Sequence, residues 1–418
     1  MRIAVLGGGV VGVASAFFLR EQGHEVTVVE RQAHVASQTS HANGGQISVS
    51  AAEPWANPGV PRQLLAWLGR DNAPLRLRLR ADPWQWAWCM RFLRECVPWR
   101  TERNMHDILQ LGMYSRDMLH ALRERRSLSY DQQRRGILHL YASSSELRAA
   151  ARCTQRMQEL GCERRLVDVE EALSIEPALR AMRARLVGAT YTAYDESGDA
   201  CAFTRELAAH CVREGVHFQL GQTVTSLCRS GNAIAHVEST TADGRFERIT
   251  ADAYVLACGS WSVPIARSAG LAVPIYPVKG YSVTLPVADA AAAWKVSLTD
   301  ERNKLVFSRL GDRLRVAGTA EVGGWTRVID DRRCAAMTAR VEAMFPGAAD
   351  TSRAISWTGL RPMTPGNVPL IGRSRMRNLY LNTGHGSLGW TLACGSAAAL
   401  AGLVDGRLPP IRFNFLGT

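Results

Sequence analysis

The first thirty residues place a strand, a glycine-rich turn, a helix and a second strand in immediate succession. The apolar, partly β-branched run Arg2–Leu6 is typical of a buried parallel strand. It leads into the sequence GGGVVG, which supplies the spacing G-x-G-x-x-G at the start of an apolar helix over residues 10–22. Residues 24–30 then read as a second strand that ends in an acid. This order predicts a βαβ unit that binds a dinucleotide.

Each glycine of this turn has a separate physical role. Gly7 permits the tight turn, Gly9 lets the backbone approach a pyrophosphate, and Gly12 lets the helix pack closely on the strand. The first helical residues, Val10 and Val11, offer unpaired N–H groups to phosphate oxygens. The turn therefore predicts where the phosphates of the ligand bind.

The acid that ends the second strand, Glu30, is placed to accept hydrogen bonds from ribose hydroxyls. A carboxylate there repels a 2′-phosphate, which argues against NADP. The βαβ unit alone does not distinguish FAD from NAD. A polar, glycine-rich stretch over residues 39–50 follows, and its sequence Asn43-Gly44-Gly45-Gln46 is expected to offer free backbone N–H groups on the ligand side.

Composition places the chain among ordinary globular proteins. Its 418 residues are 46% hydrophobic and 21% charged, which excludes a disordered chain, collagen and a coiled coil. The length corresponds to about two to three domain-sized units. Ten cysteines occur without a C-x-x-C pair, and their wide spacing does not resemble a zinc or iron–sulfur site. We therefore expect free, mostly buried thiols in a reducing compartment, and no bound metal.

Positive charge is concentrated in one part of the chain. The net charge is +12, and 47 of the 50 basic residues are arginine. Residues 62–135 hold 15 arginines and 8 acids, a net +7, in a segment (61–135) that is predicted to be mainly helical and is rich in tryptophan. The run RLRLR at 76–80 precedes WQW at 84–86, a composition typical of a bilayer interface.

Two interpretations of this segment stay open: a membrane-binding surface, or a solvated helical face over core tryptophans. The arginines form no recognised nucleic-acid-binding motif, so nucleic acid is not an expected partner. The apolar run over residues 392–404 is shorter than the ~20 residues that span a bilayer. Residues 1–20 mimic a secretory signal but fit the strand–turn–helix pattern better. We expect a soluble protein, or one bound only to a membrane surface.

Nucleotide-type elements recur in the middle and at the end of the chain. Strands are predicted at 136–143 and 186–195, a helix at 204–214, and β-rich segments over 216–259 and 275–324. We predict an α/β protein (α+β overall) with two discontinuous domains. The Rossmann-like nucleotide domain takes residues 1–60, 200–272 and 356–418, and the second domain takes residues 61–199 and 273–355.

Six segments together resemble one enzyme family. They are RIAVLGGGVVGVASAF, TSHANGGQIS, YDESGDA, YPVKGYSVT, WTGLRPMTPGNVPLIG and LNTGHGSLGWTLACGSA. Their order and spacing are similar, nearly end to end, to bacterial FAD-dependent D-amino-acid dehydrogenases of the small, catalytic subunit type, within the D-amino-acid oxidase and glycine oxidase group. The resemblance implies a Rossmann-like FAD-binding domain and a substrate domain with a large antiparallel sheet.

The resemblance also implies an activity. A D-amino acid is oxidised to an imino acid, which hydrolyses to a 2-oxo acid and ammonia, and we expect direct hydride transfer to N5 of a non-covalently bound FAD. Electrons then pass to a quinone or other acceptor. Such proteins are cytoplasmic and attach peripherally to the cytoplasmic face of the inner membrane, which agrees with the basic, tryptophan-rich segment.

Four residues are expected at the substrate. Arg361 matches the family's carboxylate-binding arginine, and its planar fork suits a carboxylate. Tyr281 is expected to be a second substrate contact, or else a core tyrosine. Lys279 is expected to bridge a water to flavin N5, and His385 to be a flavin-edge or structural residue.

The C-terminal block at 382–391 resembles the family's flavin-binding block. The helix that begins near Gly389 is expected to stabilise negative charge on reduced flavin through its N-terminal N–H groups. The full set of predicted cofactor-binding residues is Gly7, Gly9, Val10, Val11, Gly12, Glu30, Arg31, Thr39, Ser40, Asn43, Gly44, Gly45, Gln46, Val224, Cys258, Gly259, Trp261, Gly384, Gly386, Ser387, Leu388, Gly389, Trp390 and Thr391.

Departures from the family pattern put the substrate in question. His41 and Gly44 replace small residues of an Ala-Asn-Ala-Gly type, and Gly366-Asn367 replaces an Asp-Gly pair. The substrate is then a bulky D-amino acid, D-alanine or a cyclic amine such as hydroxy-D-proline. The alternatives are an oxygen-using oxidase of glycine, sarcosine or a related amine, and a non-enzymatic FAD or NAD sensor or nucleic-acid binder.

Overall fold

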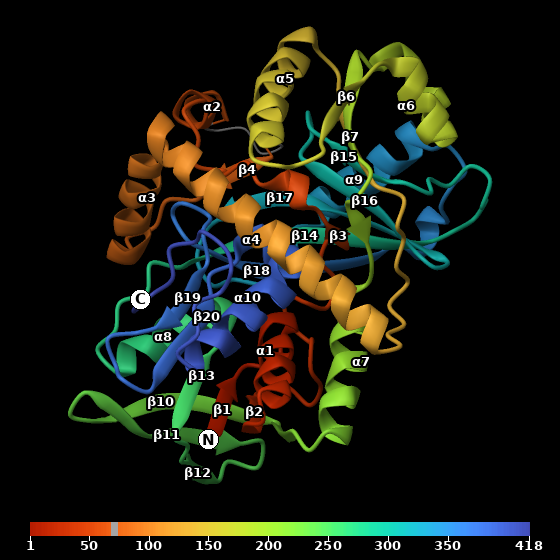
Figure 1. The fold of residues 1–418 in the computed structure, drawn as a ribbon. Coiled ribbons are helices and arrows are strands. Elements are labelled where there is room, and N and C mark those ends of the chain that lie inside the picture. The colour runs from red at the N-terminus through yellow and green to blue at the C-terminus, as the bar shows by residue number, and fades with distance from the viewer. Residues whose placement is uncertain (68–73) are drawn as a thin grey trace.

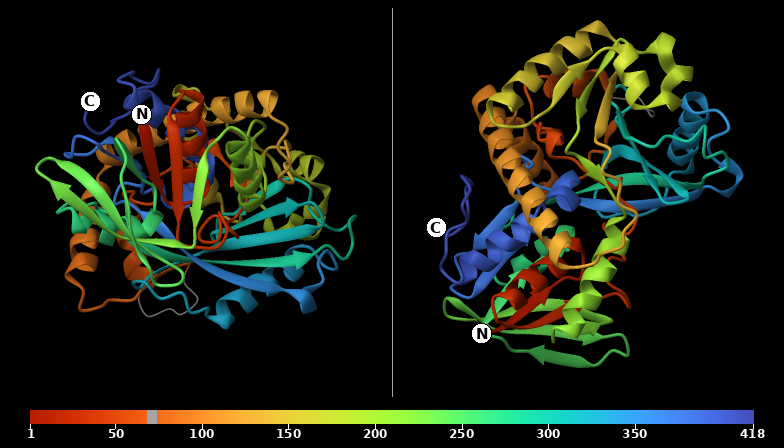
Figure 2. Two further views of the ribbon diagram at one scale, coloured as in Figure 1. Left: turned by 90° about the horizontal axis from the view of Figure 1, so that it is seen from below. Right: turned by 45° about the vertical axis from the view of Figure 1, so that its right-hand side comes forward.

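The structure is a computed structural model that describes residues 1–67 and 74–418. Six residues of the predicted basic segment, 68–73, and the side chains of residues 65–67 lie outside the described part. Figures 1 and 2 show two lobes, one with the N-terminal strand and one with the helices α5 and α6 (bounds below). The long sheet in the middle of Figure 1 belongs to the second lobe.

The first lobe is built on a six-stranded, mainly parallel sheet that includes the predicted βαβ unit. Along its central strand, Ile3 and Val5 pack into the core beneath α1 (Val10–Glu21) and α10 (Gly389–Val404). Ala4 and Leu6 pack on the other face, beneath α8 (Ser262–Ser268). This alternation buries the strand on both faces, as its sequence predicts. The strands in order across the sheet are β19 (Leu370–Arg373), β20 (Leu379–Thr383), β13 (Ala253–Leu256), β1 (Arg2–Leu6), β2 (Glu25–Glu30) and β9 (His217–Leu220).

A three-stranded antiparallel sheet lies at the bottom of this lobe in Figure 1. Its two hairpin turns contain Gly231 and Gly244, and both glycines have positive φ. Its inner face packs with α8 (Ser262–Ser268) against the six-stranded sheet. The strands are β10 (Gln222–Ser230), β11 (Ala233–Thr241) and β12 (Phe246–Ile249).

The second lobe is built on a nine-stranded, mainly antiparallel sheet, which confirms the predicted fold class. One face covers a core with α9 (Asp331–Met344) and α6 (Val169–Ile175). The strand that carries Arg361 belongs to this sheet, although the predicted domain division places it in the nucleotide domain. The strands in order are β18 (Ile355–Met363), β14 (Tyr276–Pro286), β17 (Arg313–Val322), β16 (Leu305–Leu310), β15 (Ser297–Asp300), β5 (Ile137–Tyr141), β7 (Gly188–Thr192) and β6 (Arg165–Val167), with β4 (Leu75–Leu77) paired to β17.

Helices join the two lobes. The 28-residue α4 crosses the front of the molecule in Figure 1 and packs on α10 at its centre. The predicted helix over 204–214 begins four residues earlier, because Asp199 caps it by accepting hydrogen bonds from the N–H groups of Cys201 and Ala202. The helices are α1 (Val10–Glu21), α2 (Val60–Trp67), α3 (Pro83–Glu95), α4 (Pro98–Arg125), α5 (Ser144–Glu159), α7 (Ala200–Arg213) and α10 (Gly389–Val404).

Within the described ranges 1–67 and 74–418, one helical stretch is long and apolar enough to span a bilayer by length and composition. It is Gly386–Val404, 19 residues with a mean hydropathy of 1.5, and so exceeds the apolar run counted from the sequence. Most of it is buried inside the protein, where α10 packs between α1 and α4. Burial of this kind is typical of a core helix.

Candidate functional site

A cavity of about 1180 Å³ lies between the nucleotide lobe and the nine-stranded sheet. Every predicted cofactor-binding residue except Gly12 lines it, and so do Arg361, Tyr281 and His385. Lys279 does not line it. The structure thus brings residues from both ends and the middle of the chain to one place, as expected for the crevice at the carboxyl ends of parallel strands.

The glycine turn accepts no larger residue at two positions. Gly7 has a φ of +112°, and a Cβ there would lie 2.6 Å from the carbonyl oxygen of Ala257. A Cβ on Gly12 would lie 1.8 Å from the carbonyl oxygen of Gly7. Helix α1 begins at Val10, so its N-terminus faces the cavity, as dinucleotide phosphates require.

Two polar side chains, those of Glu30 and Ser40, form hydrogen bonds with backbone N–H groups at and beside this turn. The Glu30 carboxylate accepts hydrogen bonds from the N–H groups of Gly8, at 2.7 Å, and Gln32, at 2.9 Å. Ser40 Oγ accepts the N–H of Val10 at 3.0 Å, so this helical N–H already has a partner. Glu30 is therefore held by backbone on both oxygens at the end of β2.

Three side chains of the nine-stranded sheet anchor the loop over residues 42–44. Ser282 Oγ, Arg315 Nη1 and Ser308 Oγ donate hydrogen bonds to its three consecutive carbonyl oxygens, at 2.7, 3.0 and 2.7 Å. The sequence reasoning missed these residues. Ser282 directly follows the predicted site residue Tyr281. Successive side chains of a strand point to opposite faces, and this alternation was the signal that could have indicated Ser282.

The loop presses against this sheet. Gly44 is one of the departures from the family pattern. A Cβ there would lie 2.5 Å from Val306 Cγ2 on the neighbouring strand, so the position requires glycine. Gly45 has a φ of +73°, and its N–H donates to Asn43 Oδ1 at 2.9 Å. This N–H is therefore not free for a ligand, contrary to the expectation from the sequence.

The C-terminal block approaches the cavity through a tight turn after β20. Gly384 and Gly386 have positive φ, and a Cβ on Gly384 would lie 2.7 Å from Thr364 Cγ2. Helix α10 then begins at Gly389, as predicted, with its N-terminus at the cavity. Thr391 borders the cavity, and its Oγ1 accepts the N–H of Ser48 at 3.0 Å.

His385 is buried and tied to the helix that follows it. Its Nε2 lies 3.0 Å from Ser396 Oγ, and burial lowers the pKa of His385 to about 3. The imidazole is therefore neutral at physiological pH. Trp390 is a core residue: its Nε1 donates to the carbonyl of Gly198, and its ring packs on Phe203 with centroids 4.6 Å apart.

Arg31 and Trp261 lie together at the rim. The guanidinium of Arg31 stacks 4.2 Å above the Trp261 ring, which packs on Trp325 from the loop after β17. Burial lowers the pKa of Arg31. Cys258 donates through Sγ to the carbonyl of Leu6, and burial raises the pKa of its thiol to about 12, which keeps the thiol protonated.

Arg361 places a cation inside the cavity. Its Nη1 donates to the carbonyl of Thr319 at 2.9 Å. On the neighbouring strand β14, a Cβ added to Gly280 would lie 2.2 Å from the same Nη1. Burial lowers the pKa of Arg361 to about 10, so the group stays charged at neutral pH. Among residues 1–67 and 74–418, no carboxylate forms an ion pair with it. A desolvated guanidinium without an acidic partner is suited to binding an anion.

Lys279 and Tyr281 lie on the other face of the sheet. Val278 pairs with Arg361, so Lys279, the next residue of β14, projects away from Arg361. Its Nζ lies 3.4 Å from Oε1 of Glu321, and the Tyr281 hydroxyl donates to Oε2 of the same carboxylate. Tyr281 borders the cavity without directing its hydroxyl into it. The structure thus does not place either polar group at Arg361.

Trp55 forms a wall of the cavity beside Arg361. The guanidinium carbon lies 5.9 Å from the centre of the Trp55 ring. The backbone N–H of Trp55 donates to Oδ1 of Asn367 at 2.8 Å, and Asn367 has a φ of +64°. Asn367, one of the departures from the family pattern, thus holds Trp55 in place at the cavity wall. The sequence alone did not reveal this contact.

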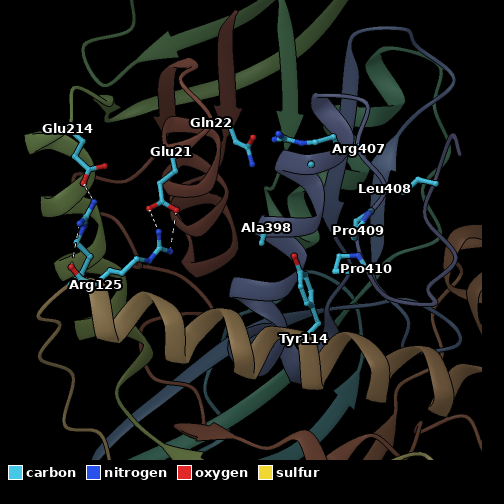
Figure 3. A pocket seen from close by; sticks show the side chains of 12 residues that line it. Glu21, Gln22, Tyr114, Arg125, Glu214, Ala398, Arg407, Leu408, Pro409 and Pro410 are labelled. Atoms are coloured by element: carbon cyan, nitrogen blue, oxygen red, sulfur yellow. Dashed lines mark hydrogen bonds and ion pairs between the residues drawn. The ribbon is translucent and has the colours of Figure 1, made fainter.

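A second cavity, of about 730 Å³, lies between α1, α4 and α10 and is drawn in Figure 3. Four of its charged side chains pair with one another: Arg125 with Glu21 at 2.8 Å, and Arg126 with Glu214 at 2.6 Å. None of the predicted site residues lines it. The site described above is therefore the one that the sequence and the structure support together.

A family model described as FAD dependent oxidoreductase matches residues 2–403. The chain belongs to this family. FAD is therefore its cofactor, and the glycine turn, the acid of β2 and the two helix N-termini at the cavity fit that dinucleotide. As a member of this family the protein is an oxidoreductase, as the sequence predicted.

Curated relatives match over the whole chain. The protein is 53% identical over 416 residues to the D-amino acid dehydrogenase of Dechloromonas aromatica (strain RCB), with 100% of both chains covered. It is 48% identical over 418 residues to the D-amino acid dehydrogenase of Paramagnetospirillum magneticum (strain ATCC 700264 / AMB-1), with 100% of this chain and 98% of the relative covered.

Solved structures share the fold of this oxidoreductase. Glycine oxidase from Geobacillus kaustophilus superposes with a TM-score of 0.75 at 21% identity, over 98% of this chain and 96% of the other. L-alpha-glycerophosphate oxidase from Mycoplasma pneumoniae, with FAD bound, gives a TM-score of 0.73 at 18% identity, over 100% and 99% of the chains.

Proposed function

We propose that this FAD-dependent oxidoreductase oxidises D-amino acids to 2-oxo acids and ammonia and passes the electrons to a quinone or other acceptor. The observation that carries the proposal is the cation of Arg361, which projects into the cavity and lacks a carboxylate partner among the described residues. The names of the whole-length relatives support the choice of D-amino acids. Bound FAD supplies the hydride acceptor.

In this proposal Arg361 binds the substrate carboxylate and so orients the Cα–H bond. The hydrogen bond to Thr319 fixes the guanidinium, and its other N–H groups can form the bidentate pair. His385 is neutral and bonded to Ser396, so it is assigned to the structure of the flavin-binding turn and not to proton transfer. The substrate amine enters neutral, and no side-chain base is required.

The wall next to Arg361 favours an apolar side chain on the substrate. Trp55, Val60, Leu75 and Phe92 line the same cavity, and each takes part in one apolar cluster. Charged side chains lose hydration against such a wall, whereas apolar ones gain by burial. We propose that D-amino acids with apolar side chains are preferred to those with charged ones.

Anaerobic bleaching of the flavin tests the proposed function. The purified yellow protein is mixed with D-, L- and N-substituted amino acids, and the loss of flavin absorbance is followed. We expect bleaching by apolar D-amino acids and not by their L enantiomers. Bleaching only by glycine or sarcosine, or rapid peroxide formation unaffected by quinone analogues, would instead support the oxygen-using oxidase. A flavin that no amino acid bleaches would support the sensor.

We also propose that α3 binds the cytoplasmic face of the inner membrane, where a quinone is met. Trp86, Met90 and Leu93 lie on one face of this helix and are 48, 62 and 42% exposed. Arg91 and Arg94 are exposed beside them, and no ion pair of either lies within the described residues. An apolar stripe flanked by cations is complementary to an anionic bilayer surface.

The arginines that the sequence indicated as membrane contacts are engaged within the protein. Arg78 pairs with the buried Glu321 at 2.8 Å, and Arg76 lies 3.8 Å from Asp330. Arg80 donates to the carbonyl of Gly323. Helix α3, at the left edge of Figure 1, therefore carries the cations of the proposed surface.

A further inference from the structure

Three metal-binding side chains meet on the β10–β11 hairpin. Cys228 lies on β10, and His236 and Glu238 lie on β11, and one ligand atom from each lies within 4.8 Å of the others. Cys228 pairs directly with His236 across the hairpin, and Glu238 follows on the same face two residues later. We propose that these three side chains bind a zinc ion.

The three ligands occupy the outer face of the hairpin. Leu227 and Val237, which alternate with them, are buried in the core beneath α8. Cys228, His236 and Glu238 are half-buried or partly exposed, so an ion can enter from solvent. One face of the hairpin thus packs into the core, and the other face carries the proposed site.

His236 supplies an independent indication of a ligand. Its Nε2 is buried, and no hydrogen-bond partner for it lies within residues 1–67 and 74–418. The same atom lies 3.9 Å from Oε1 of Glu238. A buried ring nitrogen without a partner is costly, and coordination of a cation between His236 and Glu238 removes the cost.

Ser226 orients the carboxylate ligand. Its Oγ donates to Oε2 of Glu238 at 2.7 Å and lies 3.6 Å from Sγ of Cys228. Hydrogen bonds of this kind fix ligand orientation in metal sites.

The ligand set selects zinc. Thiolate, imidazole and carboxylate are its usual ligands, and bonds of about 2.0–2.3 Å place tetrahedral ligand atoms about 3.5 Å apart. Small rotamer changes close the present separations to that value, and water supplies the fourth ligand. Arg248, opposite Glu238 on β12, is exposed and has to turn towards solvent when the cation binds.

This site could not be recognised along the chain because its ligands come from two strands. A search for C-x-x-C pairs finds ligands that are adjacent along the chain, whereas here a hairpin brings them together. Thr225, next to Ser226, lines the FAD cavity, but the zinc site does not depend on the proposed reaction.

Metal uptake by the FAD-bound full chain, without an affinity tag, tests the proposal. Chelator-treated protein is dialysed against Zn²⁺, and bound zinc is measured per chain. We expect one zinc per chain, with the affinity at least roughly tenfold lower in Cys228→Ala and in His236→Gln. Cys89→Ala, which removes a half-buried thiol on α3, is the matched control and is expected to bind zinc normally.

A second measurement needs no variant. Zn²⁺ is expected to slow the alkylation of Cys228 by iodoacetamide at least roughly tenfold, followed by peptide mass spectrometry, because a bound thiolate is shielded. Cobalt substitution should add absorption bands at longer wavelengths than those of oxidised flavin. Equal alkylation with and without Zn²⁺, or equal zinc uptake by the wild-type chain and Cys228→Ala, overturns the proposal.

Discussion

The Nζ of Lys279 lies 3.4 Å from Oε1 of Glu321, and both side chains are almost completely buried. The Tyr281 hydroxyl donates to the other oxygen at 3.1 Å, and Nε of Arg78 lies 2.8 Å from the first. Groups from β14, from β17 and from the residue that follows β4 thus form one ionic cluster on the face of the nine-stranded sheet opposite Arg361. This cluster ties the start of the basic segment to the substrate lobe.

Replacement of Lys279 by Met tests whether the lysine stabilises the fold or assists the reaction. We expect a lower melting temperature, corresponding to about 3 kcal/mol or less because Arg78 remains beside Glu321. The rate of flavin reduction by substrate should change little. Both are measured on the FAD-bound protein, by thermal unfolding and by anaerobic stopped flow. A large loss of flavin reduction without a lower melting temperature would support a water-bridging role.

Replacement of Gly280 by Ala should disturb the carboxylate site without touching the cofactor turn. The added Cβ would lie 2.2 Å from Nη1 of Arg361, so the guanidinium has to move. We expect KM to rise about tenfold or more, a loss of about 1.4 kcal/mol, while FAD stays bound. Arg361→Ala should raise KM further.

The control for this change is Gly112→Ala in α4. There the added Cβ meets Val49 at 3.4 Å, an ordinary contact, so KM should stay within twofold of the wild-type value. An unchanged KM in both Gly280→Ala and Arg361→Ala would remove the carboxylate role from Arg361.

The βαβ unit could be predicted because all its determinants are local. The strand run, the glycines and Glu30 lie within one segment, and each constrains its own neighbourhood. The start of α10 at Gly389 is also local, because Gly384 and Gly386 set the turn that precedes it. Here the family resemblance and the physical reasoning agree.

What could not be predicted depends on which strands become neighbours. The position of Lys279 follows from the pairing of β14 with β17, where Glu321 lies opposite it, 42 residues later in the chain. A register shift between Lys279 and Tyr281 adds a bulge, which the sequence of the strand itself does not predict. Ser308 and Arg315 likewise reach the cofactor loop only because their strands cross it.

Asn367 should influence which substrates bind, through Trp55. Asn367→Gly keeps the left-handed backbone but removes the acceptor of the part-buried Trp55 N–H, at a cost below the about 1–3 kcal/mol of a fully buried unsatisfied donor. We expect KM to rise several-fold for D-phenylalanine and less for D-alanine, because the larger side chain depends more on the Trp55 wall. Steady-state kinetics with both substrates measure this ratio. Equal changes for the two would show that the Trp55 wall does not select substrates.

The stability of the protein should fall with acid through His385. Its folded pKa is about 3, below the 6.5 of an unfolded histidine, because burial disfavours the charged ring. Between those values the unfolded state binds more protons, so stability is full above pH 6.5 and decreases as the pH falls towards 3. One such group contributes at most about 1.4 kcal/mol per pH unit.

The comparison that isolates this effect is the wild-type chain against His385→Gln. Melting temperatures of the FAD-bound proteins are measured from pH 7.5 to about 5, a range chosen around the ordinary histidine pKa of about 6.5. The variant should show a shallower decrease with acid, whatever its absolute stability. Parallel curves would mean that His385 does not cause the acid response over this pH range.

Binding of α3 to anionic vesicles should depend on Arg91 and Arg94. Replacing both by Ser is expected to weaken binding roughly 30-fold at low salt, since each basic residue contributes about 1 kcal/mol near such a surface. High salt should weaken the wild-type interaction in the same direction. Vesicle co-sedimentation of the FAD-bound protein measures both effects.

The matched control carries the same change of charge elsewhere. Arg180 and Arg332 are exposed on the substrate lobe, so their double replacement by Ser lowers the net charge equally without altering α3. If binding follows the local stripe, this control sediments like the wild-type chain, and Trp86→Ser weakens binding at constant charge. Equal weakening in both double variants would show that the overall charge of +12, and not α3, attracts the bilayer.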